Sequence, residues 1–338
     1  MDNYLGAYLH RLDPFAIGFI RWYGLAYLAG FAVGYIWMRS LARRRCTPLA
    51  PEAVADFVCV VALGTVLGGR LGYCAFYQPS LLAHFDTNIP FWGALAINQG
   101  GMSSHGGMIG MTVAIFWFAR RVKLPGLHLM DLIGLVAPIG IVFGRLANFV
   151  NGELYGRLCA SDLPWGVKFP QDLVEWKFDG SGRLVTPEFQ NVLQLAASGE
   201  NAPSLEQVVV AVQSNDAVAA ALEPLLSTRH PSQLYAALLE GLLVLCVVVW
   251  LWRKPRKPGV LSGVFFVSYA VVRIFGEQFR MPDSHLGFQA LGLTRGQWIS
   301  IVMLVLGIVF LALTARRKVA LMGGIRTPRE GELKVPAC

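Results

Sequence analysis

Several charged and polar side chains of this sequence stand inside apolar stretches. Arg145 and Asn148 lie in GRLANFVNGELYGR (residues 144–157), directly after the apolar run LIGLVAPIGIVF. A charge near the centre of a bilayer costs about 2.5–3.5 kcal/mol on insertion scales, and such residues usually face a bundle interior. Their spacing of three places both side chains on one helix face. Because guanidinium groups bind phosphate oxygens in pairs, this face is typical of a phosphate site.

The same stretch continues with Asn151 and Glu153 among glycines. Glycine loosens the helix and lets the backbone approach a ligand closely, and Glu153 falls near the outer end of the predicted span. The alternative is a polar network whose only role is to hold helices together.

A second cluster lies in SYAVVRIFGEQFR. Tyr269, Arg273, Glu277 and Arg280 follow one face of an otherwise apolar helix. The simpler interpretation is an Arg273–Glu277 ion pair that neutralises itself for membrane insertion. That pair alone leaves Tyr269 and Arg280 without a role, which favours a binding function.

Three further polar residues stand in apolar or glycine-rich surroundings. His105, in QGGMSSHGGMIG, could transfer a proton near neutral pH, or it could be a structural histidine. Arg70, in GTVLGGRLGY, could bind a lipid phosphate or cap a helix pair, and the small residues there predict tight helix packing. Glu240, in RHPSQLYAALLEG, lies inside an apolar run and needs a partner that the pattern does not identify.

The elements that position these residues are membrane helices. Hydrophobic residues make up 55% of the 338-residue chain and charged residues only 15%, and the mean hydropathy is +0.51. A span needs about 20 apolar residues. We therefore predict an all-α polytopic membrane protein with seven transmembrane helices, at about 17–38, 53–77, 101–119, 127–151, 232–252, 259–279 and 296–315.

Lysine and arginine gather in the connections on one side of these spans and in the tail, which predicts an outer N-terminus and a cytoplasmic C-terminus. The net charge of +8 thus reflects topology, which argues against nucleic-acid binding. The catalytic domain is expected over residues 1–315. It contains an extracytoplasmic α/β-like insertion, 152–230, with a turn in KFDGSGRL and a surface helix over 201–226. Residues 316–338 form a cytoplasmic tail that we expect to be disordered.

The six cysteines show no paired spacing, so neither a zinc site nor a disulfide framework is expected. Arginines, a histidine and a glutamate in the outer half of a membrane indicate an enzyme that acts on an anionic lipid. A transporter or flippase for an anionic solute would use the same arginines, but it often shows repeated halves, and none is visible here. A non-catalytic lipid-binding scaffold would leave His105 and the Arg273–Glu277 pair without a role.

The sequence resembles the prolipoprotein diacylglyceryl transferase family. The matching stretches, in family order over residues 21–280, are RWYGLAY, GGRLGY, GGMSSHGG, GRLANFVNGELYGR, RHPSQLYAALLEG and VVRIFGEQFR. The stretch at 144–157 resembles the family signature, with Ala147 where the signature usually has glycine. The family often has an aromatic residue at the position of Ser104, and the insertion here is long.

The resemblance implies transfer of a diacylglyceryl group from phosphatidylglycerol to the lipobox cysteine of a preprolipoprotein, with no metal or cofactor. It implies that Arg145 holds the headgroup, that Asn148 and Glu153 fix its glycerol hydroxyls, and that Arg273, oriented by Glu277, stabilises the leaving phosphate. His105 is the candidate base, and Tyr23 and Tyr269 line the pocket. Asn151, Arg70 and Arg280 complete the expected substrate-binding set. The expected location is the bacterial inner membrane, as a monomer among membrane lipids.

Overall fold

The computed structural model describes residues 7–18, 20–85, 90–96, 100–177, 182–197, 202–282 and 288–325. The chain is mostly helical, and five helices are long and apolar enough to cross a membrane. This confirms a polytopic membrane protein. The five are α1 Trp22–Arg43, α2 Ala53–Phe76, α5 Gly126–Val150, the continuous helix Ser232–Trp252, and α12 Arg295–Arg316.

Helices also form at the two other predicted positions. These are α4, Ser104–Arg121, and α11, Val260–Gly276. Neither belongs to the five candidate spans, and α11 has only 17 residues. The first helix begins at Trp22, later than predicted, because Gly18 turns the chain into the hairpin of β2, Phe15–Ile17, and β3, Ile20–Arg21.

The chain divides into two compact units. Unit 1 contains residues 1–30, 138–244 and 267–305, and unit 2 contains 31–137, 245–266 and 306–338.

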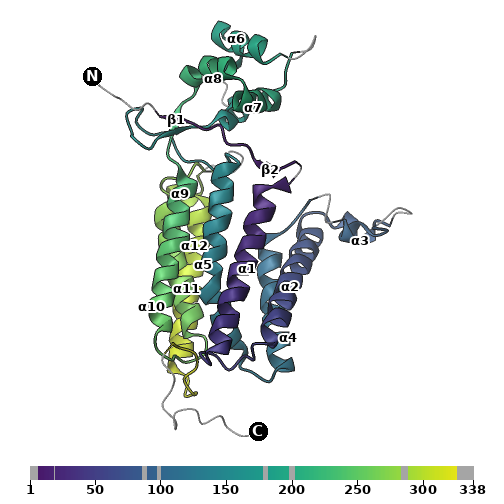
Figure 1. Cartoon of the computed structure of the whole chain (residues 1–338), viewed down its shortest axis with the longest axis vertical. Coiled ribbons are helices and arrows are strands. Elements are labelled where there is room, and N and C mark those ends of the chain that lie inside the picture. The colour runs from purple at the N-terminus through teal and green to yellow at the C-terminus, as the bar shows by residue number, and fades with distance from the viewer. Residues whose placement is uncertain are drawn as a thin grey trace. The chain divides into compact units, whose positions relative to one another are not determined.

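Unit 1 contains a small sheet and a group of short helices (Figure 1). Strand β4, Val167–Lys168, pairs parallel with β1, Tyr8–Leu9, and antiparallel with β5, Thr228–Arg229. The short helices have these bounds: η3 Pro170–Lys177, η4 Arg183–Val185, α6 Pro187–Ala196, α7 Leu205–Ser214, α8 Asp216–Leu222 and η5 Glu223–Leu225.

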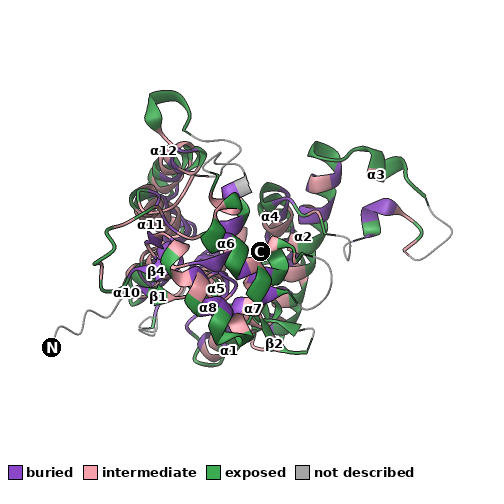
Figure 2. Ribbon diagram, turned by 90° about the horizontal axis from the view of Figure 1, so that it is seen from above, coloured by how far each residue is buried: buried purple, intermediate pink, exposed green. Residues whose placement is uncertain are grey.

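These short helices share an apolar core of their own. Trp176, Phe189, Val208 and Leu222 are among its buried members, and the same helices also carry exposed residues (Figure 2). The single surface helix predicted over 201–226 is instead two helices, because the Asn215 side chain accepts hydrogen bonds from the first backbone N–H groups of α8. Residues 178–181 of the predicted turn lie outside the described residues.

Unit 1 also contains parts of longer helices. The Ser232–Trp252 helix begins as α9, Ser232–Ala236, continues as the π-helical segment η6, Ala237–Leu243, and ends as α10, Val244–Trp252. The short 3-10 turn η7, Ala290–Gly292, precedes α12.

Unit 2 is dominated by the contact of α2 with α4, which lie side by side (Figure 1). Gly64, Gly68 and Gly72 of α2 face Gly106 and Gly110 of α4 so closely that a methyl group on Gly110 would lie 2.1 Å from the Gly64 carbonyl oxygen. Small residues at a spacing of four permit such backbone contact between membrane helices. The tight packing predicted for the Arg70 stretch is therefore confirmed.

A buried carboxylate and a backbone bridge connect further segments of unit 2. Asp131 accepts hydrogen bonds from the backbone N–H groups of Gly259 (2.8 Å) and Ser262 (2.7 Å), which satisfies the first turn of α11. Arg256 and Met322 form a backbone bridge, so the described start of the predicted tail is ordered against the chain. Residues 326–338 lie outside the described residues. The remaining elements of this unit are α3, Ser80–Ala83, and η1, Gly93–Leu95.

Candidate active site

Two arginines of unit 1 share one buried carboxylate. Arg145 of α5 donates to Glu240 Oε2 through Nη2 (2.7 Å) and Nε (3.1 Å). Arg273 of α11 donates to Glu240 Oε1 through Nη1 (2.8 Å). The Glu240 side chain is 1% exposed, whereas those of Arg145 and Arg273 are 17% and 14% exposed. The Glu240 carboxylate therefore lies at the buried bottom of the site, and the two guanidiniums above it are partly exposed.

Glu240 lies in the middle of the π-helical segment η6. A π-helical turn is frequent at functional sites because its extra residue displaces the side chains around it. Close packing supports the arrangement: a methyl group on Gly241 would lie 2.4 Å from the Val142 side chain, so glycine brings η6 against α5. The carboxylate of Glu240 is thereby held within reach of Arg145.

Arg273 lies between two carboxylates. Its Nη2 atom forms an ion pair with Glu277 Oε2 at 2.9 Å, as the spacing of four residues predicts. Tyr269, one turn earlier, donates to Glu240 Oε2 at 3.4 Å. Helix α11 ends at Gly276, so Arg280 follows the helix instead of continuing its polar face, and it pairs with Gly156 in a backbone bridge.

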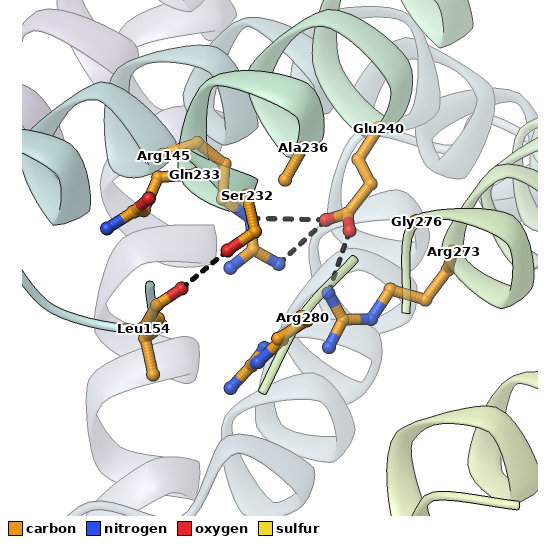
Figure 3. A pocket seen from close by; sticks show the side chains of 9 residues that line it. All are labelled: Arg145, Leu154, Ser232, Gln233, Ala236, Glu240, Arg273, Gly276 and Arg280. Atoms are coloured by element: carbon orange, nitrogen blue, oxygen red, sulfur yellow. Dashed lines mark hydrogen bonds and ion pairs between the residues drawn. The ribbon is translucent and has the colours of Figure 1, made fainter. Parts of the chain in front are cut away.

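These side chains surround a pocket (Figure 3). Leu154 and Ser232 close one side, where the Ser232 hydroxyl donates to the Leu154 carbonyl oxygen at 2.8 Å. Gln233 fixes the neighbouring carbonyl of Glu153 at 2.7 Å. The complete lining is Arg145, Leu154, Ser232, Gln233, Ala236, Glu240, Arg273, Gly276 and Arg280.

The other residues predicted for the 144–157 stretch are distributed around the end of α5. Asn148 is buried and its side-chain amide donates to the Tyr23 hydroxyl of α1. The side chain of Asn151 is also buried, while that of Glu153 is exposed. Arg145 and Asn148, expected to share one helix face, thus contact different helices.

His105 and Arg70 belong to unit 2. His105 is exposed in the first turn of α4, after Ser103, whose hydroxyl accepts the Gly106 N–H at 3.2 Å. The glycines that follow His105 have a structural task, since Gly106 packs against α2.

Arg70 is 4% exposed and donates to four backbone carbonyls, those of Gly93 (2.7 Å), Ala94 (2.9 Å), Gly100 (2.5 Å) and Gly101 (3.0 Å). This geometry supports a structural role, in which Arg70 holds the loop that precedes α4. Its role in substrate binding stays a prediction.

A pocket lined by three arginines and one carboxylate suits a phosphate-bearing ligand. A guanidinium group can bind two phosphate oxygens at once, and the attraction is stronger where the dielectric constant is low. Within the described residues, no group of three or more His, Cys, Asp or Glu side chains could hold a metal ion.

Comparison with known proteins agrees with this chemistry. The family model for prolipoprotein diacylglyceryl transferase matches residues 13–313. The chain belongs to this family. Among curated relatives, the phosphatidylglycerol–prolipoprotein diacylglyceryl transferase of Bdellovibrio bacteriovorus is 45% identical over 91% of this chain and 94% of its own. The transferase of the same name from Rhodospirillum rubrum is 40% identical over 94% of this chain and 95% of its own.

For this member of the prolipoprotein diacylglyceryl transferase family, sequence reasoning missed Glu240, Ser232 and Gln233 as parts of the pocket. The position of Glu240 inside an apolar run was a signal that a cationic partner exists, but the partners lie on other helices. Nothing in the sequence pointed to Ser232 and Gln233 as pocket residues, because their contacts are with the backbone of residues 153–154.

Proposed function

We propose that the protein transfers the diacylglyceryl group of phosphatidylglycerol to the lipobox cysteine of preprolipoproteins. The carbon–oxygen bond between the diacylglycerol and the phosphate breaks, and a thioether forms at the cysteine sulfur. The electron pair leaves with glycerol phosphate, and the thiol proton passes to a base. The observation that carries this proposal is the pairing of Arg145 and Arg273 across Glu240 in a pocket among membrane helices.

The arginines account for the electrostatics of the step. A free thiol has a pKa of about 8.5 and reacts as the thiolate. Negative charge grows on the departing phosphate, so cations fixed in advance stabilise the transition state. In this proposal Arg145 binds the headgroup phosphate. Arg273, oriented by Glu277, stabilises the leaving group.

The remaining residues position the substrates. Asn148, Asn151 and Glu153 bind the glycerol hydroxyls, and Tyr23 and Tyr269 line the pocket. His105 takes the thiol proton. Arg280 and Arg70 complete the phosphate-binding set, Arg280 from the pocket wall and Arg70 through the loop before α4.

The proposed setting is the bacterial inner membrane. Seven helices span it, α4 and α11 in addition to the five long ones. The N-terminus and the 152–230 insertion are periplasmic, and the basic connections and the tail from residue 316 are cytoplasmic. The enzyme works as a monomer without metal or cofactor, and the attacking cysteine belongs to the preprolipoprotein.

A direct assay tests the proposal. The purified protein in detergent is given phosphatidylglycerol and a lipobox peptide, and mass spectrometry detects a diacylglyceryl adduct on the peptide cysteine. We expect the adduct with the wild type and its loss in Arg145→Ala. His105→Ala tests the base separately, through a lower rate with an unchanged KM for the lipid. A folded wild-type protein that binds the lipid but forms no adduct would instead favour transport or lipid binding.

A further inference from the structure

Arg229 is a buried arginine outside the pocket, at the end of β5 and 6% exposed. Its Nη2 atom donates to Asp172 Oδ1 at 2.7 Å, and the Asp172 side chain is 1% exposed. Its Nη1 atom contacts the Gly156 carbonyl oxygen (3.3 Å) and the Met281 sulfur (3.1 Å). The guanidinium also lies over the Tyr155 ring, 5.0 Å from its centroid.

The contacts with Gly156 and Met281 reach two segments that carry a wall of the pocket, and Arg229 lies on a third. Gly156 follows Leu154 by two residues, Met281 follows Arg280 directly, and Arg229 itself precedes Ser232 by three.

Backbone hydrogen bonds join the same segments. The Gly156 N–H donates to the His230 carbonyl (2.9 Å), and the Arg157 N–H donates to the Phe279 carbonyl (2.9 Å). One side chain therefore holds three chain segments at the rim of the arginine pocket.

Asp172 connects this rim to the apolar core of the short helices. It lies in η3, whose Leu173 and Trp176 belong to the apolar core shared by α6, α7 and α8. Burial raises the pKa of the neighbouring Tyr155 hydroxyl, and the negative charge of Asp172 raises it further. The hydroxyl thus stays neutral beside the ion pair.

Stability alone is a poor explanation for such a pair. Apolar residues of similar volume often replace a buried ion pair without loss of stability, because the pair must compensate for the desolvation of both charges. Apolar side chains make no directional contacts. The planar guanidinium of Arg229, in contrast, fixes the angles between its three acceptors on Gly156, Met281 and Asp172.

We propose that Asp172 and Arg229 are a positioning pair, through which the apolar core of η3, α6, α7 and α8 holds the wall of the arginine-lined pocket in the geometry that binds the phosphate headgroup. The inference rests on the proposed transfer reaction. Neither residue contacts the reacting atoms.

The test measures KM for phosphatidylglycerol and kcat for the lipobox peptide in the full-length protein in detergent. KM does not depend on how much enzyme is folded, whereas apparent kcat falls with the folded fraction. A mutation that displaces a substrate-contacting group by about 1 Å can lower kcat/KM about a hundredfold. We expect Asp172→Asn, which keeps shape and removes charge, to raise KM about tenfold. Arg229→Lys keeps the charge but loses the fork, and it should raise KM similarly.

The matched control is Asp216→Asn. Asp216 pairs with Arg11 at 2.8 Å in the same unit, is 93% exposed, and belongs to α8 away from the pocket lining. Its KM should equal that of the wild type. Met281→Leu keeps volume and removes only the sulfur contact, so it should raise KM about threefold.

Unchanged KM in Asp172→Asn, with or without a lower melting temperature, would overturn the inference and leave a purely structural pair. If Asp172→Asn fails to fold, Arg229→Lys and Met281→Leu test the inference instead. A KM equal to that of the wild type in both variants would overturn it. No adduct from the wild type and from Asp216→Asn would instead refute the transfer reaction itself.

Discussion

Arg145 and Arg273 come from different helices and bind different oxygens of one carboxylate, that of Glu240. Two guanidiniums held this close repel each other unless an anion lies between them. Glu240 therefore keeps Arg145 and Arg273 together. In the proposed reaction it also limits the positive charge that a lipid phosphate meets.

Replacing Glu240 by glutamine should damage both stability and activity. Removing one partner from a buried ion pair typically costs about 3–5 kcal/mol, because the remaining charges are left uncompensated. We expect a clearly lower melting temperature in detergent and at least a tenfold loss of kcat/KM at temperatures where the variant is folded.

The control for Glu240→Gln is Glu223→Gln. The Glu223 side chain is 43% exposed and lies 3.6 Å from Lys168, and an ion pair at the surface is worth at most about 1 kcal/mol. An active, stable Glu240→Gln protein would show that the arginines do not need this counter-ion.

The sequence predicted the helices well because hydropathy and length decide them, as in α2 and the Ser232–Trp252 helix. It also predicted the Arg273–Glu277 pair, which depends only on local spacing. It could not assign Arg145 to Glu240, 95 residues away, because that contact depends on how η6 packs against α5. For the same reason the apolar core of α6, α7 and α8 was not foreseen: each helix alone reads as a surface helix.

Arg70→Lys separates the two roles considered for Arg70. A lysine ammonium cannot reproduce four hydrogen bonds to separate carbonyls, since it has three donors on a flexible stem. We expect faster amide hydrogen exchange in peptides that cover residues 90–96 and 100–103, accompanied by a rise of more than about twofold in KM for phosphatidylglycerol, because Arg70 acts on binding through this loop. A rise in KM for phosphatidylglycerol without faster amide hydrogen exchange would instead indicate that Arg70 binds the phosphate directly.

Gly110→Ala should separate α2 from α4. The added methyl would lie 2.1 Å from the Gly64 carbonyl oxygen, a backbone atom that cannot move aside without shifting the helix. Overpacking of this kind costs about 1–3 kcal/mol or more, so the melting temperature in detergent should fall. Gly24→Ala is the control: nothing lies within 4 Å of its added methyl, and alanine favours a helix by about 0.5–1 kcal/mol. Equal melting temperatures for the two variants would contradict the close helix contact.

His10 should make the stability of unit 1 depend on pH. Its ring is 1% exposed, lies against Phe149 and Phe169, and donates from Nε2 to the Phe149 carbonyl oxygen at 2.7 Å. Burial lowers the pKa of His10 below its usual 6.5, although the hydrogen bond to Phe149 opposes this shift. Below pH 6.5 the unfolded chain therefore binds a proton that the folded chain resists.

The stabilisation from neutral His10 is thus complete above pH 6.5 and declines as the pH falls towards the lowered pKa, with a slope of at most about 1.4 kcal/mol per pH unit. Melting temperatures in detergent from pH 7.5 to 5 should fall more steeply for the wild type than for His10→Gln, whose amide can donate the same hydrogen bond without titrating. Part of the slope should survive in His10→Gln, because partial burial also lowers the pKa of His230. Parallel curves for the two proteins would mean that His10 does not resist protonation in the folded state.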